Sequence, residues 1–247
     1  MSNLLRQFPE FSGVTENNMN SGGSYFHQLS MRLSRRLSHG FLLSFDYSHS
    51  RLMESNSYLN SGEMKLEKHV STDDRPDNVG ISALYQLPFG RGKHFWANAG
   101  GWANMIVGDW AVSTLYNYHS GAPVNWNADV IYYGGNLNWD GHNVNHTFDT
   151  TQFNTNSSQQ LTNHYRTFSS YFSNLRVDAT NNVNLSATKD FRIKEAMKLQ
   201  FRADAFNLTN HPLFAAPTIG VTSGSFGQIS STTNAPRVIQ LGLRLTF

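Results

Sequence analysis

The 247-residue sequence has no cysteine and few charged residues. Without cysteine it cannot form disulfides, zinc sites built on thiolates or a cysteine nucleophile. Charged residues make up 15% of the chain, well below the ~25% of an ordinary globular domain. The formal net charge of +2 is too small to indicate nucleic-acid binding, which needs a strongly basic surface. Nucleic acid is therefore not expected among the partners.

Long apolar runs are missing as well. No segment approaches the about 18 consecutive apolar residues that indicate a transmembrane helix. The first residues, MSNLLRQFPEFSG, contain no basic region followed by an apolar stretch, so no signal peptide is expected there. Aromatic residues reach 13% of the chain. Together with many uncharged polar residues, they suit a surface that meets both water and lipid.

The chain does contain a strong period of two. In the last residues, APRVIQLGLRLTF, apolar side chains alternate with polar or small ones. Such alternation places successive side chains on opposite faces of a β-strand. The pattern predicts seven long strands: 24–38, 41–52, 78–87, 110–119, 178–189, 197–205 and 237–247. We predict an all-β fold with antiparallel up-and-down strands.

The predicted connections alternate between short and long. Short turns are expected at 38–40 and 191–196. The long, polar connections are 53–76, 124–177 and 209–235, the second with room for a local hairpin. Short periplasmic turns and long extracellular loops are typical of outer-membrane barrels. The connection at 88–107 is longer than that rule prefers, and its alanine-rich part, 96–107, can be helical.

Alternation alone fits two environments for the apolar face. In a soluble β-sandwich this face covers a core, whereas in an outer-membrane barrel it faces lipid and the polar face lines an aqueous lumen. The predicted strands, roughly 10 to 15 residues long, exceed the about 5 to 6 of soluble strands and favour lipid. The residues predicted to face lipid are Leu199, Phe201, Ile239, Leu241, Leu243 and Leu245.

Aromatic placement favours lipid too. Trp110, Tyr116 and Tyr118 share one face of the strand at 110–119. Trp110 and Tyr118 would be separated by roughly 20 Å in a tilted strand, close to the spacing of the two interfacial aromatic girdles. We therefore predict that all three are membrane-interface residues. The alternative explanation is the general preference of Trp and Tyr for strands.

An odd number of strands affects closure. Bacterial barrels have an even number, and lipid cannot satisfy an unpaired strand edge. The chain, residues 1–247, is therefore predicted to be the carboxyl-terminal portion of a larger barrel. Alternatively, a further strand lies within 124–177 and a small eight-stranded barrel closes.

Aromatic residues in the longest loop are the candidates for ligand contact. Trp126, Tyr132, Tyr133 and Trp139 are expected to cover the barrel mouth or to contact a solute, and stacking on sugars is one option.

Two histidines in the same loop are a candidate metal site. His142 and His146 have a spacing that binds zinc on a helix, but Asp140-Gly141 favours a loop. We predict no metal and no other cofactor. No spacing of nucleophile, base and carboxylate indicates catalysis, so an enzyme is not predicted.

Several stretches resemble the carboxyl-terminal barrel of TonB-dependent outer-membrane receptors, in particular the Oar-like receptors with a carboxypeptidase-regulatory-like domain found in Acidobacteria. These stretches are LLRQFPEFSGV, NSGGSYFHQLSMRLSRRLSHGFLLSFDYSHS, DDRPDNVGISALYQLPFGRGKHF, GDWAVSTLYNYHSGAPV, FRADAFNLTNHPLF and SFGQISSTTNAPRVIQLGLRLTF. Each alone is unspecific, but their order and spacing together are fairly specific.

The resemblance implies that the chain is part of a bacterial outer-membrane barrel of about 22 strands. It also implies that the parent protein imports or exports a bulky solute. The plug, the TonB box and the signal peptide have no match here, so contact with the TonB complex would run through an amino-terminal part. Phe247 resembles the terminal aromatic signal read by the outer-membrane assembly machinery. The implied partners are the lipid bilayer, that machinery, and the rest of the barrel with its plug.

Two other functions stay open at this point. One is a soluble carbohydrate-binding β-sandwich that uses the aromatic loop residues. The other is a small stand-alone outer-membrane barrel with a structural or adhesive role.

Overall fold

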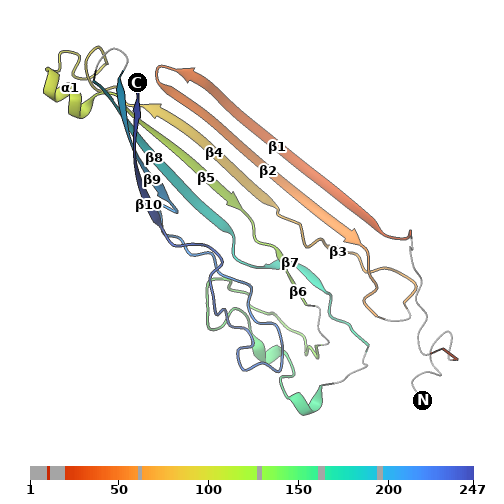
Figure 1. Cartoon of the computed structure of the whole chain (residues 1–247). Coiled ribbons are helices and arrows are strands. Elements are labelled where there is room, and N and C mark those ends of the chain that lie inside the picture. Colours follow the sequence, from red (N-terminus) through yellow and green to blue (C-terminus); the bar gives the residue numbers. More distant parts are fainter. Residues whose placement is uncertain (1–9, 12–19, 61–62, 127–129, 161–164, 194–196) are drawn as a thin grey trace.

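The computed structural model describes residues 10–11, 20–60, 63–126, 130–160, 165–193 and 197–247. Most of the stretch LLRQFPEFSGV and the end of the predicted turn at 191–196 lie outside these residues. The described chain forms one large antiparallel sheet, with its loops gathered at the two ends of the strands (Figure 1).

The main sheet contains the seven long strands that alternation predicts. They are β1 (Gly23–Ser38), β2 (Phe41–Ser55), β4 (Asp77–Gln86), β5 (Trp110–His119), β8 (Thr180–Arg192), β9 (Lys198–Phe206) and β10 (Val238–Thr246). Their order in the sheet is β1-β2-β4-β5-β8-β9-β10, and every neighbouring pair is antiparallel. The all-β, up-and-down prediction is therefore confirmed. A two-residue strand, β3 (His69–Val70), pairs with β2.

The longest loop contains a local hairpin and no strand of the main sheet among its described residues. β6 (Pro123–Asn125) and β7 (Tyr171–Arg176) pair with each other in a separate two-stranded sheet. Among the described residues of 124–177, none forms the alternative eighth barrel strand. In the described chain β1 and β10 are the two edges of an open sheet.

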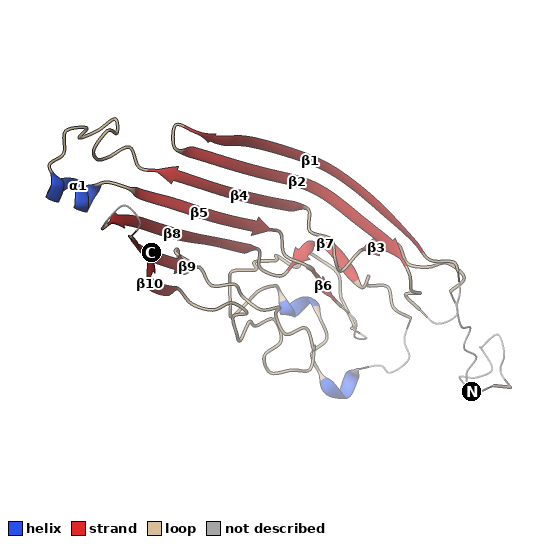
Figure 2. Cartoon of the chain, turned by 45° about the horizontal axis from the view of Figure 1, so that its top comes forward, coloured by secondary structure: helices blue, strands red, loops and turns tan. Residues whose placement is uncertain are grey.

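The two short turns lie at the end of the sheet opposite the long polar loops, as predicted, and the long β4–β5 connection is the expected exception. The β1–β2 turn, the β8–β9 connection, the carboxyl terminus and α1 (Gly101–Val107) lie at one end of the sheet (Figures 1 and 2). In the β1–β2 turn, His39 and Gly40 have positive φ angles of 52° and 78°. Glycine adopts such an angle without strain. α1 confirms the helix expected within 96–107. Among the described residues, no helix is long and apolar enough to cross a bilayer.

The strand registers combine the separate alternations into one continuous apolar face. One row across the sheet joins Leu33, Phe45, Ile81, Tyr116 and Val183. Further rows bring all six predicted lipid-facing residues onto the face that also carries Trp110 and Tyr118. A single slip in register would move a whole strand's apolar set to the other face.

The opposite face of the sheet is polar. It carries the ion pairs Arg32–Asp46, Lys198–Asp190 (2.7 Å) and Arg202–Asp204 (2.8 Å). Uncharged polar side chains and histidine occupy much of the remaining surface, as in the row Asn78–His119–Thr180. The two faces thus differ in chemistry along the whole sheet.

No second layer of described residues covers the apolar face. Leu241 and Leu243 are 67% and 71% exposed, and Figure 2 shows a single curved sheet. A β-sandwich would bury these side chains, so the sandwich alternative is wrong for the described chain. An uncovered apolar surface of this extent requires a non-aqueous environment or a partner.

Candidate functional site

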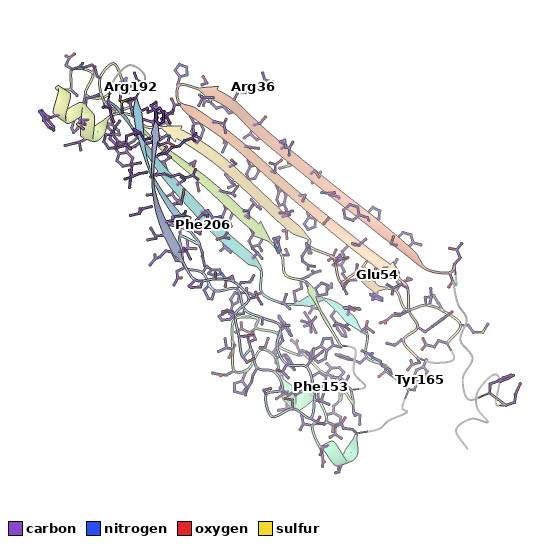
Figure 3. All side chains as sticks on the ribbon, in the orientation of Figure 1. Arg36, Glu54, Phe153, Tyr165, Arg192 and Phe206 are labelled. Atoms are coloured by element: carbon purple, nitrogen blue, oxygen red, sulfur yellow. The ribbon has the colours of Figure 1, made fainter. Side chains whose placement is uncertain are left out.

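The two longest loops fold together at the end of the sheet opposite α1. We call the described residues of 120–179 and 207–237 the loop cap. Its core consists of buried apolar residues from both loops: Val124, Trp126, Val130, Leu137, Phe148, Phe153, Phe168, Leu175, Val221 and Phe226. Figure 3 shows Phe153 within this cap, away from the sheet. The buried hydrophobic core of the described chain therefore lies almost entirely in loops.

Aromatic contacts organise the core around Trp126, which is only 1% exposed. Its ring stacks on Phe153 at 5.3 Å and meets Phe148 and Phe168 edge-on at 5.3 and 5.5 Å. Each such pair contributes about 0.5–1.5 kcal/mol beyond simple burial. The ring of Trp126 does not reach the surface, so it supports the cap from inside.

An open cavity of about 420 Å³ lies on the surface of the cap. Its apolar wall includes Tyr132, Trp139, Phe168 and Phe172. Tyr132 lies 4.6 Å from Phe168 between ring centroids, and the Tyr132 hydroxyl donates a 2.6 Å hydrogen bond to the Gly135 carbonyl. The volume falls within the range of small-molecule sites.

Two of the four predicted contact residues therefore meet in one site. Tyr132 and Trp139 line the cavity, and Trp139 stacks parallel to Phe148 at 5.7 Å. Tyr133 is 64% exposed and lies outside the lining. Phe168 and Phe172 were missed, although repeated phenylalanines in a polar loop are a signal for a packed core.

The remaining lining is polar but uncharged. Asn136, Thr167, Ser169 and Asn174 offer amide and hydroxyl groups around the aromatic wall. Among the described residues that line the cavity, none is charged. Such a site can stack on flat apolar surfaces and form hydrogen bonds at their edges.

A buried ion pair connects the cap to the sheet. Arg176 Nη2 lies 2.5 Å from Asp74 Oδ2, with Asp74 fully buried and Arg176 14% exposed. Asp74 Oδ1 also accepts a 2.6 Å hydrogen bond from the Leu52 amide. Arg176 Nη1 donates to the carbonyls of Asp74 and Gly121, at 2.9 and 3.0 Å. The pair therefore joins β2, β7 and the exit of β5.

A second set of polar contacts connects the cap to the loop after β2. The Asn60 side chain exchanges hydrogen bonds with the Arg166 backbone at 2.6 and 2.8 Å. The Tyr165 hydroxyl donates to Glu63 at 2.8 Å. Hydrogen bonds from Asn60 and Tyr165 lower the pKa of Glu63. The contribution of this contact to stability is therefore complete at neutral pH and is lost as the pH falls through that lowered pKa.

Gly121 marks a close crossing of two chain segments. A Cβ at this position would lie 1.8 Å from the Val177 carbonyl oxygen and 2.8 Å from that of Asp178. We expect Gly121→Ala to force these segments apart and to destabilise the cap by about 1–3 kcal/mol. Faster protease cleavage within the cap would measure this. Gly224→Ala is the control, since its Cβ would meet nothing within 4 Å, and equal cleavage of both variants would contradict the prediction.

The histidines of the loop do not form a metal centre in the described part of the chain. His142 Nε2 lies 3.8 Å from Asp178 and its Nδ1 lies 4.0 Å from Asp140. His146 donates its backbone amide to Asn143. Within the described ranges, no group of three or more histidines and carboxylates is placed to hold a metal ion.

Of the three predicted interface aromatics, Trp110 and Tyr118 lie toward opposite ends of β5, whereas Tyr116 lies between them, opposite Ile81. Trp110 is the first residue of β5, beside α1, and Tyr118 lies near the other end of the strand, opposite Val79 and Asn181. Phe247 follows β10 and is 92% exposed. Its use as an assembly signal stays a prediction.

Comparison with known protein families identifies a matching family. A family model described as "Outer membrane beta barrel domain" matches residues 1–240. This range includes six of the seven long strands and the start of the last. No curated protein and no solved structure gives a significant match.

Proposed function

The chain belongs to the outer membrane beta barrel domain family, and from this premise we propose that it forms part of the barrel of a TonB-dependent receptor that moves a bulky solute. The family locates it in the bacterial outer membrane. There the apolar face of the sheet meets lipid, the polar face lines the lumen, and the long loops are extracellular. The receptor role is supported by the open sheet and the cap.

The open sheet carries the proposal. Within the described chain, β1 and β10 each have an unpaired edge and run in the same direction, because five strands separate them. Direct pairing between them would be parallel, whereas outer-membrane barrels are antiparallel. Hydrocarbon does not tolerate unpaired edges. An odd number of further strands, supplied by a parent chain, would close the barrel.

The loop cap supports a role in solute handling. It lies at the extracellular end, and its uncharged cavity combines aromatic rings with amide and hydroxyl groups. A neutral ligand with flat apolar faces and polar edges, such as an oligosaccharide, matches that chemistry. The extracellular end is where an imported solute first meets the protein.

Conductance tests the incomplete barrel. We expect the purified 247-residue chain to give no steady single-channel current in planar bilayers, because an open sheet encloses no lumen. Detergent diluted without protein provides the baseline. Stable unitary currents of one size would contradict the proposal and indicate that the chain closes alone.

Saccharide binding tests the cavity. We expect Trp139→Ala to weaken binding of neutral oligosaccharides by about 2- to 10-fold, since an aromatic contact contributes about 0.5–1.5 kcal/mol. Trp139→Phe should retain most of the affinity. Tyr133→Ala is the matched control, because Tyr133 is exposed outside the cavity. Isothermal titration of the reconstituted protein measures the affinities, and equal losses at both positions would refute the assignment.

A further inference from the structure

The connection between β4 and β5 carries an apolar surface that no described part of the chain covers. On α1, Trp102 is 82% exposed, Ile106 69% and Met105 51%. Their i, i+3, i+4 spacing places them on one face of the helix. Asn104, on the other side, accepts a 2.6 Å hydrogen bond from the Arg91 amide. An ordinary surface helix turns its apolar face inward, so the outward apolar face of α1 needs a different explanation.

Two hydrogen bonds hold the end of α1 on the apolar side of the sheet. Trp110 Nε1 donates to the Ile106 carbonyl at 2.9 Å, and the Lys189 ammonium donates to the Gly108 carbonyl. Trp110 and Lys189 lie in one register row with Phe201, on the face that meets lipid. The end of α1, with Ile106, therefore adjoins the apolar face of the sheet.

Basic side chains gather beside this helix. A cavity of about 700 Å³ lies between the α1 connection and the β8–β9 turn. Its charged lining is Arg91, Lys93, Asp109, Lys189, Asp190 and Arg192. Cations outnumber carboxylates, and Asp190 is already paired with Lys198 at 2.7 Å. Figure 3 shows Arg192 at this end of the sheet, next to α1.

We propose that residues 89–109 dock into the periplasmic leaflet of the outer membrane and bind an anionic phospholipid. Trp102 and Ile106 enter the boundary between headgroups and acyl chains, where amphipathic helices and tryptophans concentrate. Arg91, Lys93 and Arg192 receive the phosphate. This gives the long periplasmic connection a function, and it depends only on the outer-membrane location and not on the proposed transport.

Spin labelling tests the depth of α1. Because the 247-residue chain has no cysteine, Ile106→Cys gives the purified and reconstituted chain a label at one position. Leu243→Cys calibrates the lipid-facing surface, and Gly224→Cys calibrates the aqueous cap. We expect the label at position 106 to collide with oxygen about as often as the label at position 243 does. We also expect it to be shielded from a water-soluble nickel chelate. The proposal would be overturned if the label at position 106 were as accessible to the nickel chelate as the label at position 224. It would also be overturned if protein shielded the label at 106 from both oxygen and nickel.

Lipid selectivity tests the phosphate site. In reconstituted vesicles, quenching of tryptophan by brominated phosphatidylglycerol relative to brominated phosphatidylcholine measures the preference for an anionic headgroup. Each basic residue contributes about 1 kcal/mol, or about fivefold, so Arg91→Gln with Lys93→Gln should lower the preference about 25-fold. Lys65→Gln with Lys68→Gln removes the same charge at the extracellular end and should change nothing. The phosphate site would be overturned if the unsubstituted protein showed no preference for the anionic lipid. It would also be overturned if both double variants lost the same amount of that preference.

Discussion

Replacement of Asp74 by alanine is expected to unfold the loop cap while the strands stay in the membrane. The substitution leaves Arg176, only 14% exposed, without its carboxylate, and it leaves the Leu52 amide without its acceptor. Removal of one partner of a buried ion pair costs about 3–5 kcal/mol. A folded unit of this size has only about 5–15 kcal/mol of stability, so the substitution would remove a large share of the cap's stability.

Hydrogen exchange of the cap measures this effect. We expect protection to fall across β6, β7 and the aromatic core in Asp74→Ala, and to fall less in Asp74→Asn, which keeps an acceptor for Leu52. Asp73→Ala is the matched control, since Asp73 is exposed and adjacent. If Asp73→Ala and Asp74→Ala lose the same protection, the ion pair does not stabilise the cap.

Replacement of Ile81 by arginine should strongly reduce assembly into the outer membrane. Ile81 lies in the middle of β4, paired with Phe45 on one side and Tyr116 on the other, on the apolar face. An arginine facing lipid near the bilayer midplane costs about 2–4 kcal/mol, or roughly 30- to 1000-fold in the folding equilibrium. The amount of heat-modifiable protein in outer-membrane fractions reports the outcome.

The neighbouring position supplies the control for the lipid face. Ser82 follows Ile81 in the same strand, faces the lumen, and pairs with Ser44 and Leu115. Ser82→Arg adds the same charge and bulk to a water-exposed surface. The free energy of folding should therefore change by no more than about 0.5 kcal/mol. If Ser82→Arg fails to assemble while Ile81→Arg assembles normally, the two faces have been assigned the wrong way round.

The strands were predictable because alternation is a property of consecutive residues. β10 illustrates this: four alternating apolar residues, Ile239, Leu241, Leu243 and Leu245, indicate both a strand and its two faces without knowledge of any neighbour. The loop cap was not predictable in this way. Trp126 has no periodic pattern around it, and a tryptophan in a polar loop is as consistent with ligand contact as with a buried position.

The same limit applies to the charged residues. Nothing in the run STDDRPD distinguishes the buried Asp74 from the exposed Asp73. The partner of Asp74 lies 102 positions further along the chain. Pairing over such distances follows from how the loops cross, and no local propensity encodes it.

The sequence by itself thus determined the seven strands, their two faces and the alternation of short turns with long loops. These features depend on side-chain period and on turn residues within a few positions of one another. The tertiary structure alone decided that two loops share an aromatic core, that Tyr132 and Trp139 line one cavity, and that the end of α1 is hydrogen-bonded to Trp110 and Lys189 on the apolar face of the sheet. Each of these depends on contacts between segments far apart in the chain, which only the folded registers bring together.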